Sequence, residues 1–201
     1  MHFFENWIII SALLFKDGQQ QMPKIIKDAK ETIVREARAL LATCGATKLN
    51  MRALAESAGV AAGTLYNYFP SKEDLIAEVV REDWYTMLEA IDPKLHAVHT
   101  ATLGLERIFN AIVEYTKIHR ELWANIRTSK KFQAKYFDYH KEMLDQICIR
   151  VRLLGTRFGF LSDPTVAPFI SEVLLAGGMY PDSRFQYLTP CLKILVGEKD
   201  F

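Results

Sequence analysis

Apolar side chains recur every three or four residues along most of this chain, which is the spacing of one face of an α-helix. The longer apolar stripes cover residues 26–44, 75–91, 103–116, 132–151, 166–174 and 185–196. A short helix is also expected around residues 122–126. In the C-terminal half, no run alternates strictly enough to predict a β-strand. The pattern therefore predicts an all-α protein.

Residues 53–69 differ from the long stripes because they predict two short helices joined by a turn. Gly59 can adopt a left-handed backbone conformation that costs other residues about 1 kcal/mol or more. Val60 follows the turn as an apolar plug, and Leu65 returns a side chain to the same core. This is the layout of a helix-turn-helix unit, although an ordinary helical hairpin with a tyrosine-rich outer face would share it.

The second short helix begins with small residues, Ala61, Ala62, Gly63 and Thr64. Small side chains let the start of a helix approach the wall of a DNA groove. Backbone N–H groups and the positive end of the helix dipole favour phosphate there. The Thr64 hydroxyl and methyl groups can reach a phosphate or a thymine. The pair of helices therefore indicates DNA binding.

The flanking segments support this interpretation. The stripe before the pair ends at Gly45, which predicts the end of a first long helix. After the pair, Pro70 interrupts the chain and Ser71 can cap a new helix that has Glu73 and Asp74 in its first turn. Three helices are thus expected to be closed off by a long fourth one.

Several short motifs occur together in this region. They are Ile33, Ala37, Leu40, Gly45, Leu54-Ala55, Ala58-Gly59-Val60, Gly63-Thr64-Leu65-Tyr66, Tyr68-Phe69, and Ser71-Lys72-Glu73 with Leu75. On these residues the chain strongly resembles the N-terminal domain of the tetracycline-repressor (TetR) family of transcriptional regulators. The resemblance covers about residues 25–82, and the combined pattern is far more specific than a lone motif.

The resemblance implies that the second helix of the pair lies in the major groove. It gives DNA-contact roles to Arg52, Ala61, Ala62, Gly63, Thr64, Tyr66, Asn67, Tyr68 and Lys72. Arg52 and Lys72 are expected to bind phosphate, which positions the domain without reading sequence. Tyr66 is expected to contact the DNA backbone, and Asn67 and Thr64 are the candidates for base edges.

One part of this surface departs from the family pattern. Family members often carry Thr or Ser near position 51 and a larger polar residue near position 61 or 62, whereas this chain has Met51, Ala61 and Ala62. Direct reading of bases is therefore expected to be sparse, and groove shape is expected to contribute more.

The resemblance also implies a domain organisation. Residues 1–22 form an N-terminal extension, residues 23–82 a helix-turn-helix DNA-binding domain, and residues 83–201 a helical ligand-binding and dimerisation domain. The last two helices would pair with those of a second subunit in a four-helix interface. The resulting homodimer would hold its two recognition helices roughly 34–36 Å apart, one turn of DNA.

The middle helices would then enclose an effector pocket. Aromatic and flexible residues could line it, namely Trp84, Phe109, Tyr115, Trp123, Phe137, His140 and Met143. Such a lining favours a small apolar or aromatic molecule, although the same stripe could be plain core. The expected function is a repressor that binds a (pseudo)palindromic double-stranded DNA operator as a dimer. Ligand binding would shift the population toward a form in which the fourth helix has moved and the half-site spacing is lost.

Charge contributes little to this prediction. The net charge is +1 over 201 residues, and residues 23–81 hold nine Lys or Arg against seven Asp or Glu. An excess of two positive charges is small for a DNA-binding domain, so the prediction of DNA binding depends on the helix-turn-helix motif. The basic run at residues 150–157 is expected to be a solvated helix face.

Cysteine and histidine offer alternatives. Cys44, Cys148 and Cys191 are far apart and odd in number, which suits a reduced cytoplasmic setting and core filling, with redox sensing as the alternative. His96 and His99 lie one helical turn apart but lack nearby Cys or acidic ligands, a weak metal signal. We therefore expect no catalytic site, metal or cofactor. A metal- or redox-responsive regulator, or a helical interaction module without DNA binding, remain the alternatives.

The first 22 residues lie outside the helix-turn-helix pattern. Their apolar segment is shorter than the ~20 residues that span a bilayer. It also lacks a basic leader and a small-residue cleavage site, so it predicts neither a membrane anchor nor a signal peptide. Met22-Pro23 has the form of a natural beginning, since proline suits the first turn of a helix. The extension is expected to be an upstream-start artefact or an added helix.

Overall fold

The computed structural model describes residues 28–122, 130–161, 163–180 and 182–197, and the side chains of residues 130–137 are not among those described. Within these ranges the chain is helical and contains no strand, so the all-α prediction is confirmed. The expected N-terminal extension and most of the short helix expected at residues 122–126 lie outside the described residues.

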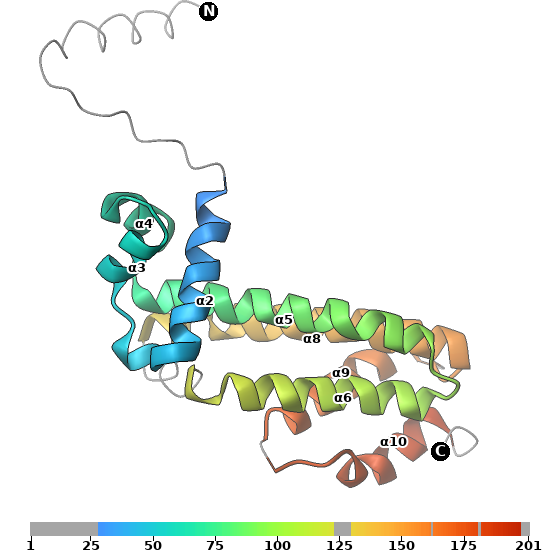
Figure 1. Ribbon diagram of the computed structural model, residues 1–201. Coiled ribbons are helices and arrows are strands. Elements are labelled where there is room, and N and C mark those ends of the chain that lie inside the picture. The colour runs from blue at the N-terminus through green and yellow to red at the C-terminus, as the bar shows by residue number, and fades with distance from the viewer. Residues whose placement is uncertain (1–27, 123–129, 162, 181, 198–201) are drawn as a thin grey trace, which may run out of the picture.

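Three helices form the N-terminal part of the molecule (Figure 1): α2 (Ala29–Lys48), α3 (Met51–Ser57) and α4 (Ala62–Tyr68). The regular course of α2 is interrupted at Gly45, whose φ of 72° is left-handed, as the apolar pattern predicted. The side chain of Asn50 caps α3 by accepting hydrogen bonds from the backbone N–H groups of Arg52 and Ala53.

The remaining helices form a bundle behind and below the first three (Figure 1). They are α5 (Lys72–His96), α6 (Ala101–Ile118), α8 (Lys130–Phe158), α9 (Val166–Gly178) and α10 (Thr189–Val196), with a short 3-10 helix η1 (Phe185–Tyr187) before the last. The prediction of one continuous helix over residues 185–196 was therefore wrong. Pro190 lies in the first turn of α10, where its missing N–H is harmless, whereas inside a longer helix it would remove a hydrogen bond.

The helix α5 belongs to both parts. Ser71 caps it by accepting a hydrogen bond from the Asp74 N–H, as the sequence predicted. Its buried residues begin at Leu75 under α2–α4 and end at Leu95 in the bundle, and they belong to one continuous apolar core. The helix crosses the domain boundary expected near residue 82 without a break.

Polar contacts reinforce this packing. Arg150 is 9% exposed and binds Asp92 with two hydrogen bonds of 2.8 Å, which ties α8 to α5. The expectation that residues 150–157 form a solvated face was therefore wrong at Arg150, because the bidentate partner compensates its burial. Cys191 is exposed, so the expectation of core filling was wrong for that residue.

Three charged side chains, Arg38, Asp83 and His119, form a chain of hydrogen bonds from α2 through α5 to the end of α6, which we call the Arg38–Asp83–His119 network. Arg38 Nε donates to Asp83 Oδ1 at 2.6 Å, and His119 Nε2 lies 2.8 Å from Asp83 Oδ2. His119 Nδ1 lies 2.9 Å from the Tyr115 carbonyl oxygen. Both partners of the buried imidazole are oxygen atoms that can accept hydrogen bonds, so the ring is held between α5 and α6.

The network also acts on the Asp83 carboxyl. Burial raises its pKa, but the hydrogen bonds and positive charges of His119 and Arg38 outweigh burial and hold the pKa below its ordinary value. The ionised form of Asp83 is therefore stabilised by folding.

We expect Gly59→Ala to lower the free energy of unfolding by about 1–2 kcal/mol, because Gly59 has a φ of 67° and no atom near the added Cβ. The cost is then one of backbone strain alone. Gly63→Ala is the matched control, since Gly63 is helical and equally open, and it should be neutral or stabilising by up to about 1 kcal/mol. Chemical denaturation measures both, and equal effects would contradict the assigned turn.

Asp83→Asn should lower the free energy of unfolding by roughly 1–3 kcal/mol at neutral pH, because it removes a charged partner of two buried or half-buried groups. Since folding depresses the pKa of Asp83, its contribution is present above the unfolded pKa of about 4 and is lost as the pH falls through the lower folded value. The difference between wild type and variant should shrink toward pH 2. Glu82→Gln, which removes only the exposed partner of Arg38, should cost under about 1 kcal/mol. A difference that stays constant with pH would refute this role.

Candidate nucleic-acid interface and effector groove

The turn between α3 and α4 is held by backbone hydrogen bonds. The Gly59 N–H donates to the Glu56 carbonyl at 3.1 Å, and the Val60 N–H donates to the Ala55 carbonyl at 2.9 Å. Leu65 on α4 is fully buried, and Phe69 just after α4 is almost so. These anchors present the opposite side of α4 to the outside in a defined orientation.

Most of the residues predicted to contact DNA lie on that outer side. Arg52 on α3 and Ala61, Ala62, Gly63 and Asn67 are exposed. Tyr66 and Tyr68 are 44% and 48% exposed, which is unusual for large apolar rings, and Thr64 is half-buried. The structure therefore leaves seven of these residues exposed and Thr64 half-buried on α3, on α4 and at the start of α4; we call this outer part of the two helices the α3–α4 surface.

Gly63 is the most informative position on this surface. It has an ordinary helical backbone, and a Cβ added there would meet no atom within 4 Å. Neither backbone conformation nor internal packing requires a glycine in the isolated chain. The space that the missing side chain leaves is therefore open toward the outside. Ala61 supplies no side-chain cap to α4, so N–H groups of its first turn also remain accessible.

Lys72 differs from the other predicted contacts. It is half-buried, and its Nζ donates to the carbonyl oxygens of Thr47 and Leu49, both at 3.2 Å. The ammonium thus joins the start of α5 to the last turn of α2 and to the residue that follows it. Since an ammonium has three donors, one N–H remains for another acceptor. The sequence could not predict these two hydrogen bonds, because both carbonyl groups lie more than twenty residues before Lys72 in the chain.

A second candidate site lies between α5 and α6, where an open groove of about 580 Å³ runs along the two helices. We call it the α5–α6 groove. From α5 it is lined by Asp83, Thr86, Met87, Ala90, Ile91 and Lys94; from α6 and the residue after it by Arg107, Asn110, Ala111, Glu114, Tyr115, Ile118 and His119. Its lining is mainly apolar, as expected of a small-molecule site.

Of the residues predicted to contact an effector, Tyr115 lines this groove. Trp84, Phe109 and Met143 are buried in the core, and His140 is half-buried with its Nε2 3.8 Å from Glu172 Oε1. Trp123 and the side chain of Phe137 lie outside the described residues. Sequence reasoning missed the other groove residues. Most of them are polar, charged or small side chains beside the apolar stripes, where such residues normally face water, whereas Met87 and Ile91 lie on a stripe that predicts core.

Tyr115 joins the groove to the core. Its hydroxyl donates to the Val80 carbonyl at 2.9 Å, and its ring meets Trp84 edge-on at 5.1 Å between centroids. Burial and the negative charge of Asp83 raise the pKa of the Tyr115 hydroxyl well above its usual range, so it stays a hydrogen-bond donor. The buried Trp84 Nε1 has no hydrogen-bond partner among the described residues.

The described part of the chain holds no group of three or more His, Cys, Asp or Glu side chains that could bind a metal ion. His96 and His99, the predicted candidates, are exposed near the end of α5. No helix in the same part has the length and apolar character needed to cross a bilayer.

Known proteins are similar to the part of the chain that contains the α3–α4 surface. Residues 33–79 match the family described as bacterial regulatory proteins, tetR family. The chain is 28% identical over 132 residues to the HTH-type transcriptional repressor AcnR of Corynebacterium efficiens, which is 63% of this chain and 64% of that protein. It is 32% identical over 99 residues to an HTH-type transcriptional regulator of Haemophilus influenzae, 49% of this chain and 46% of the relative. The matches thus span less than two thirds of these relatives.

Solved structures share the fold over a longer stretch. The TetR-family repressor FadR of Thermus thermophilus, solved with lauroyl-CoA, has a TM-score of 0.58 at 20% identity, covering 83% of this chain and 92% of that one. Salmonella enterica GusR has a TM-score of 0.57 at 18% identity, covering 88% and 99%. Residues 33–79, which match the family, contain the turn at Gly59 and the predicted DNA contacts from Arg52 to Lys72. Residues 33–79 are therefore similar to the bacterial regulatory proteins of the tetR family, and the chain as a whole shares the fold of solved regulators.

Proposed function

We propose that this protein is a ligand-responsive transcriptional repressor, and not an enzyme, that binds a (pseudo)palindromic operator as a homodimer. The observation that carries the proposal is the α3–α4 surface, above all the open space at Gly63 between exposed Ala62 and Tyr66. A surface that keeps large rings exposed beside an empty glycine position suits a partner that approaches the backbone closely. The wall of the DNA major groove is such a partner.

Different residues of the α3–α4 surface have different roles in DNA binding. Arg52 supplies a phosphate contact, and Tyr66 lies where it can contact the sugar–phosphate backbone. Asn67 and Thr64 are the groups able to hydrogen-bond base edges. Because Ala61 and Ala62 carry only methyl groups, few bases are read directly, and groove shape carries more of the specificity.

The low positive charge of residues 23–81 favours DNA binding by a two-fold symmetric dimer. An excess of two charges over residues 23–81 gives one domain little affinity for phosphate. Two domains held one turn of DNA apart, roughly 34–36 Å, would combine their contacts. DNA binding would also make the cytoplasm the site of action.

The helices α9 and α10 offer a surface for that pairing. Phe169 on α9 is 55% exposed, Ile194 on α10 is 86% exposed, and Tyr180 and Tyr187 lie exposed between them. Exposed large apolar groups on successive elements of the chain suit a self-complementary interface. We assign the homodimer contact to these last two helices.

Repression and its release follow from α5. The relatives AcnR of Corynebacterium efficiens and KstR of Rhodococcus jostii are both named transcriptional repressors. A small, apolar effector that prefers a shifted position of α5 would change the separation of the two α4 helices. The Arg38–Asp83–His119 network would pass that shift from the bundle to α2.

Gly63→Leu should abolish specific DNA binding while leaving the fold intact, because the added side chain fills space that is open in the free protein. Arg52→Ala should weaken binding to all sequences and reduce the salt dependence by about one counterion. Electrophoretic mobility shift with the DNA upstream of the protein's own gene, repeated at several salt concentrations, measures both.

Ala42→Leu provides the matched control for Gly63→Leu, since Ala42 is exposed on α2 and lies outside α3 and α4. It should bind like the wild type. Unchanged binding by both Gly63→Leu and Tyr66→Ala would refute DNA recognition by α4.

The double variant Phe169→Glu with Ile194→Glu should turn the dimer into a monomer, because charges would replace apolar contacts at the interface. Its operator affinity should fall at the same time. Light scattering after size exclusion measures the mass. Ile149→Glu, an exposed isoleucine on α8, is the control that should stay dimeric. A double variant that remains dimeric would show that the contact lies elsewhere.

A further inference from the structure

The α5–α6 groove is long and narrow because of how its two walls run. Asp83 on α5 meets His119 just after α6 at 2.8 Å, and Arg107 on α6 donates to the backbone carbonyl of Lys94 on α5. The walls are therefore antiparallel and in register at both ends. Eleven helical steps separate Asp83 from Lys94, so the groove is about 16 Å long.

The middle of the groove is apolar. Met87 and Ile91 line it from α5, and Ala111 and the exposed Ile118 line it from α6. Ala90 and Ala111 face each other across a space that larger side chains would close. Methionine adapts its shape to an apolar neighbour. A flexible hydrocarbon chain matches this lining better than a compact polar molecule.

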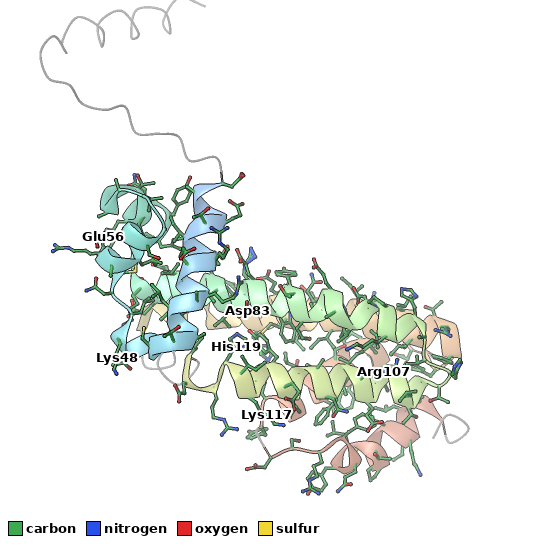
Figure 2. The ribbon with its side chains drawn as sticks, viewed as in Figure 1. Lys48, Glu56, Asp83, Arg107, Lys117 and His119 are labelled. Carbon is green, nitrogen blue, oxygen red and sulfur yellow. The ribbon has the colours of Figure 1, made fainter. Side chains whose placement is uncertain are left out.

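The two ends of the groove differ in charge. At one end Lys94 and Arg107 have no ion-pair partner among the residues that the structure describes, and Arg107 donates only to the Lys94 carbonyl. At the other end the Asp83 carboxylate is occupied by Arg38 and His119. Glu114 is paired with Lys117 at 2.7 Å. The uncompensated charge of the groove is therefore positive and lies at the Lys94 end. Figure 2 shows Arg107 toward one end of α6 and His119 with Asp83 toward the other.

We propose that the α5–α6 groove binds an elongated aliphatic molecule with one anionic end, a carboxylate or a phosphate. The anion lies against Lys94 and Arg107, and the chain runs along Ala90 and Ala111 toward Tyr115 and His119. The inference deepens the proposed function, on which its regulatory consequence rests. A chain long enough to reach His119 contacts the Arg38–Asp83–His119 network, whereas a short one does not.

Four probes of equal chain length test the charge at the end of the ligand: decanoate, decyl phosphate, decan-1-ol and decyltrimethylammonium. Isothermal titration with the full chain should detect binding of at least one of the two anions, and weaker or no binding of the alcohol and the cation. The two anions distinguish a carboxylate from a phosphate ligand. Equal binding of all four probes, or of none, would overturn the proposal.

Two variants test the location. Lys94→Gln should weaken binding of the better anion roughly three- to tenfold, because it removes one half of an ion pair at the groove end. Ala111→Phe should abolish it by filling the groove. Arg152→Gln, which removes an exposed cation from α8, is the control and should bind like the wild type. Wild-type affinity in both groove variants would place the ligand elsewhere. A second filling variant, Ala90→Phe, gives the same readout if Ala111→Phe fails to fold.

The mobility-shift assay separates this inference from the proposed function. The better anion should change the operator affinity of the wild type but not that of Ala111→Phe, and butanoate should have less effect than decanoate. DNA binding without any bound probe would overturn the groove inference alone. If a probe binds but the protein never binds DNA, the groove inference stands and the proposal of a repressor is refuted.

Discussion

The burial of one side of α5 along its whole length holds the two parts of this protein together. Residues from Leu75 to Leu95 face the core on that side, first beneath α2–α4 and then inside the bundle. This helix of 25 residues contributes side chains to one continuous, close-packed apolar core along its whole length. The same helix thus connects the bundle with the three N-terminal helices.

The polar side of α5 also connects the two parts of the protein, through the contacts of Asp83. Asp83 accepts a hydrogen bond from Arg38 on α2 and contacts His119 just after α6, and it also lines the α5–α6 groove. One carboxylate thus touches the two parts and the candidate effector site. Its charge is stabilised by both partners, so a ligand that disturbs either partner changes the contact between α2 and α5.

Much of the structure of the helix-turn-helix part could be predicted from residues that are close in sequence. The turn at Gly59, the cap at Ser71 and the interruption at Gly45 each depend on neighbouring residues, and each was predicted. The structure differs where the partner is distant in sequence. Lys72 bonds carbonyls before α3, and Arg150 reaches Asp92 on another helix. The break before α10 was missed although Pro190 is a local signal, because the apolar stripe continued across it.

The sequence by itself determined the helical periods, the turn chemistry and the helix-turn-helix pair, because these depend on residues a few positions apart. Only the tertiary structure decided which of the predicted effector residues line a groove and which are core. Trp84 and Tyr115 are both buried aromatic residues on amphipathic helices, yet only Tyr115 lines the groove. A helix exposes a groove where its neighbour brings small side chains, as at Ala90 and Ala111, and that pairing depends on how two helices meet in space.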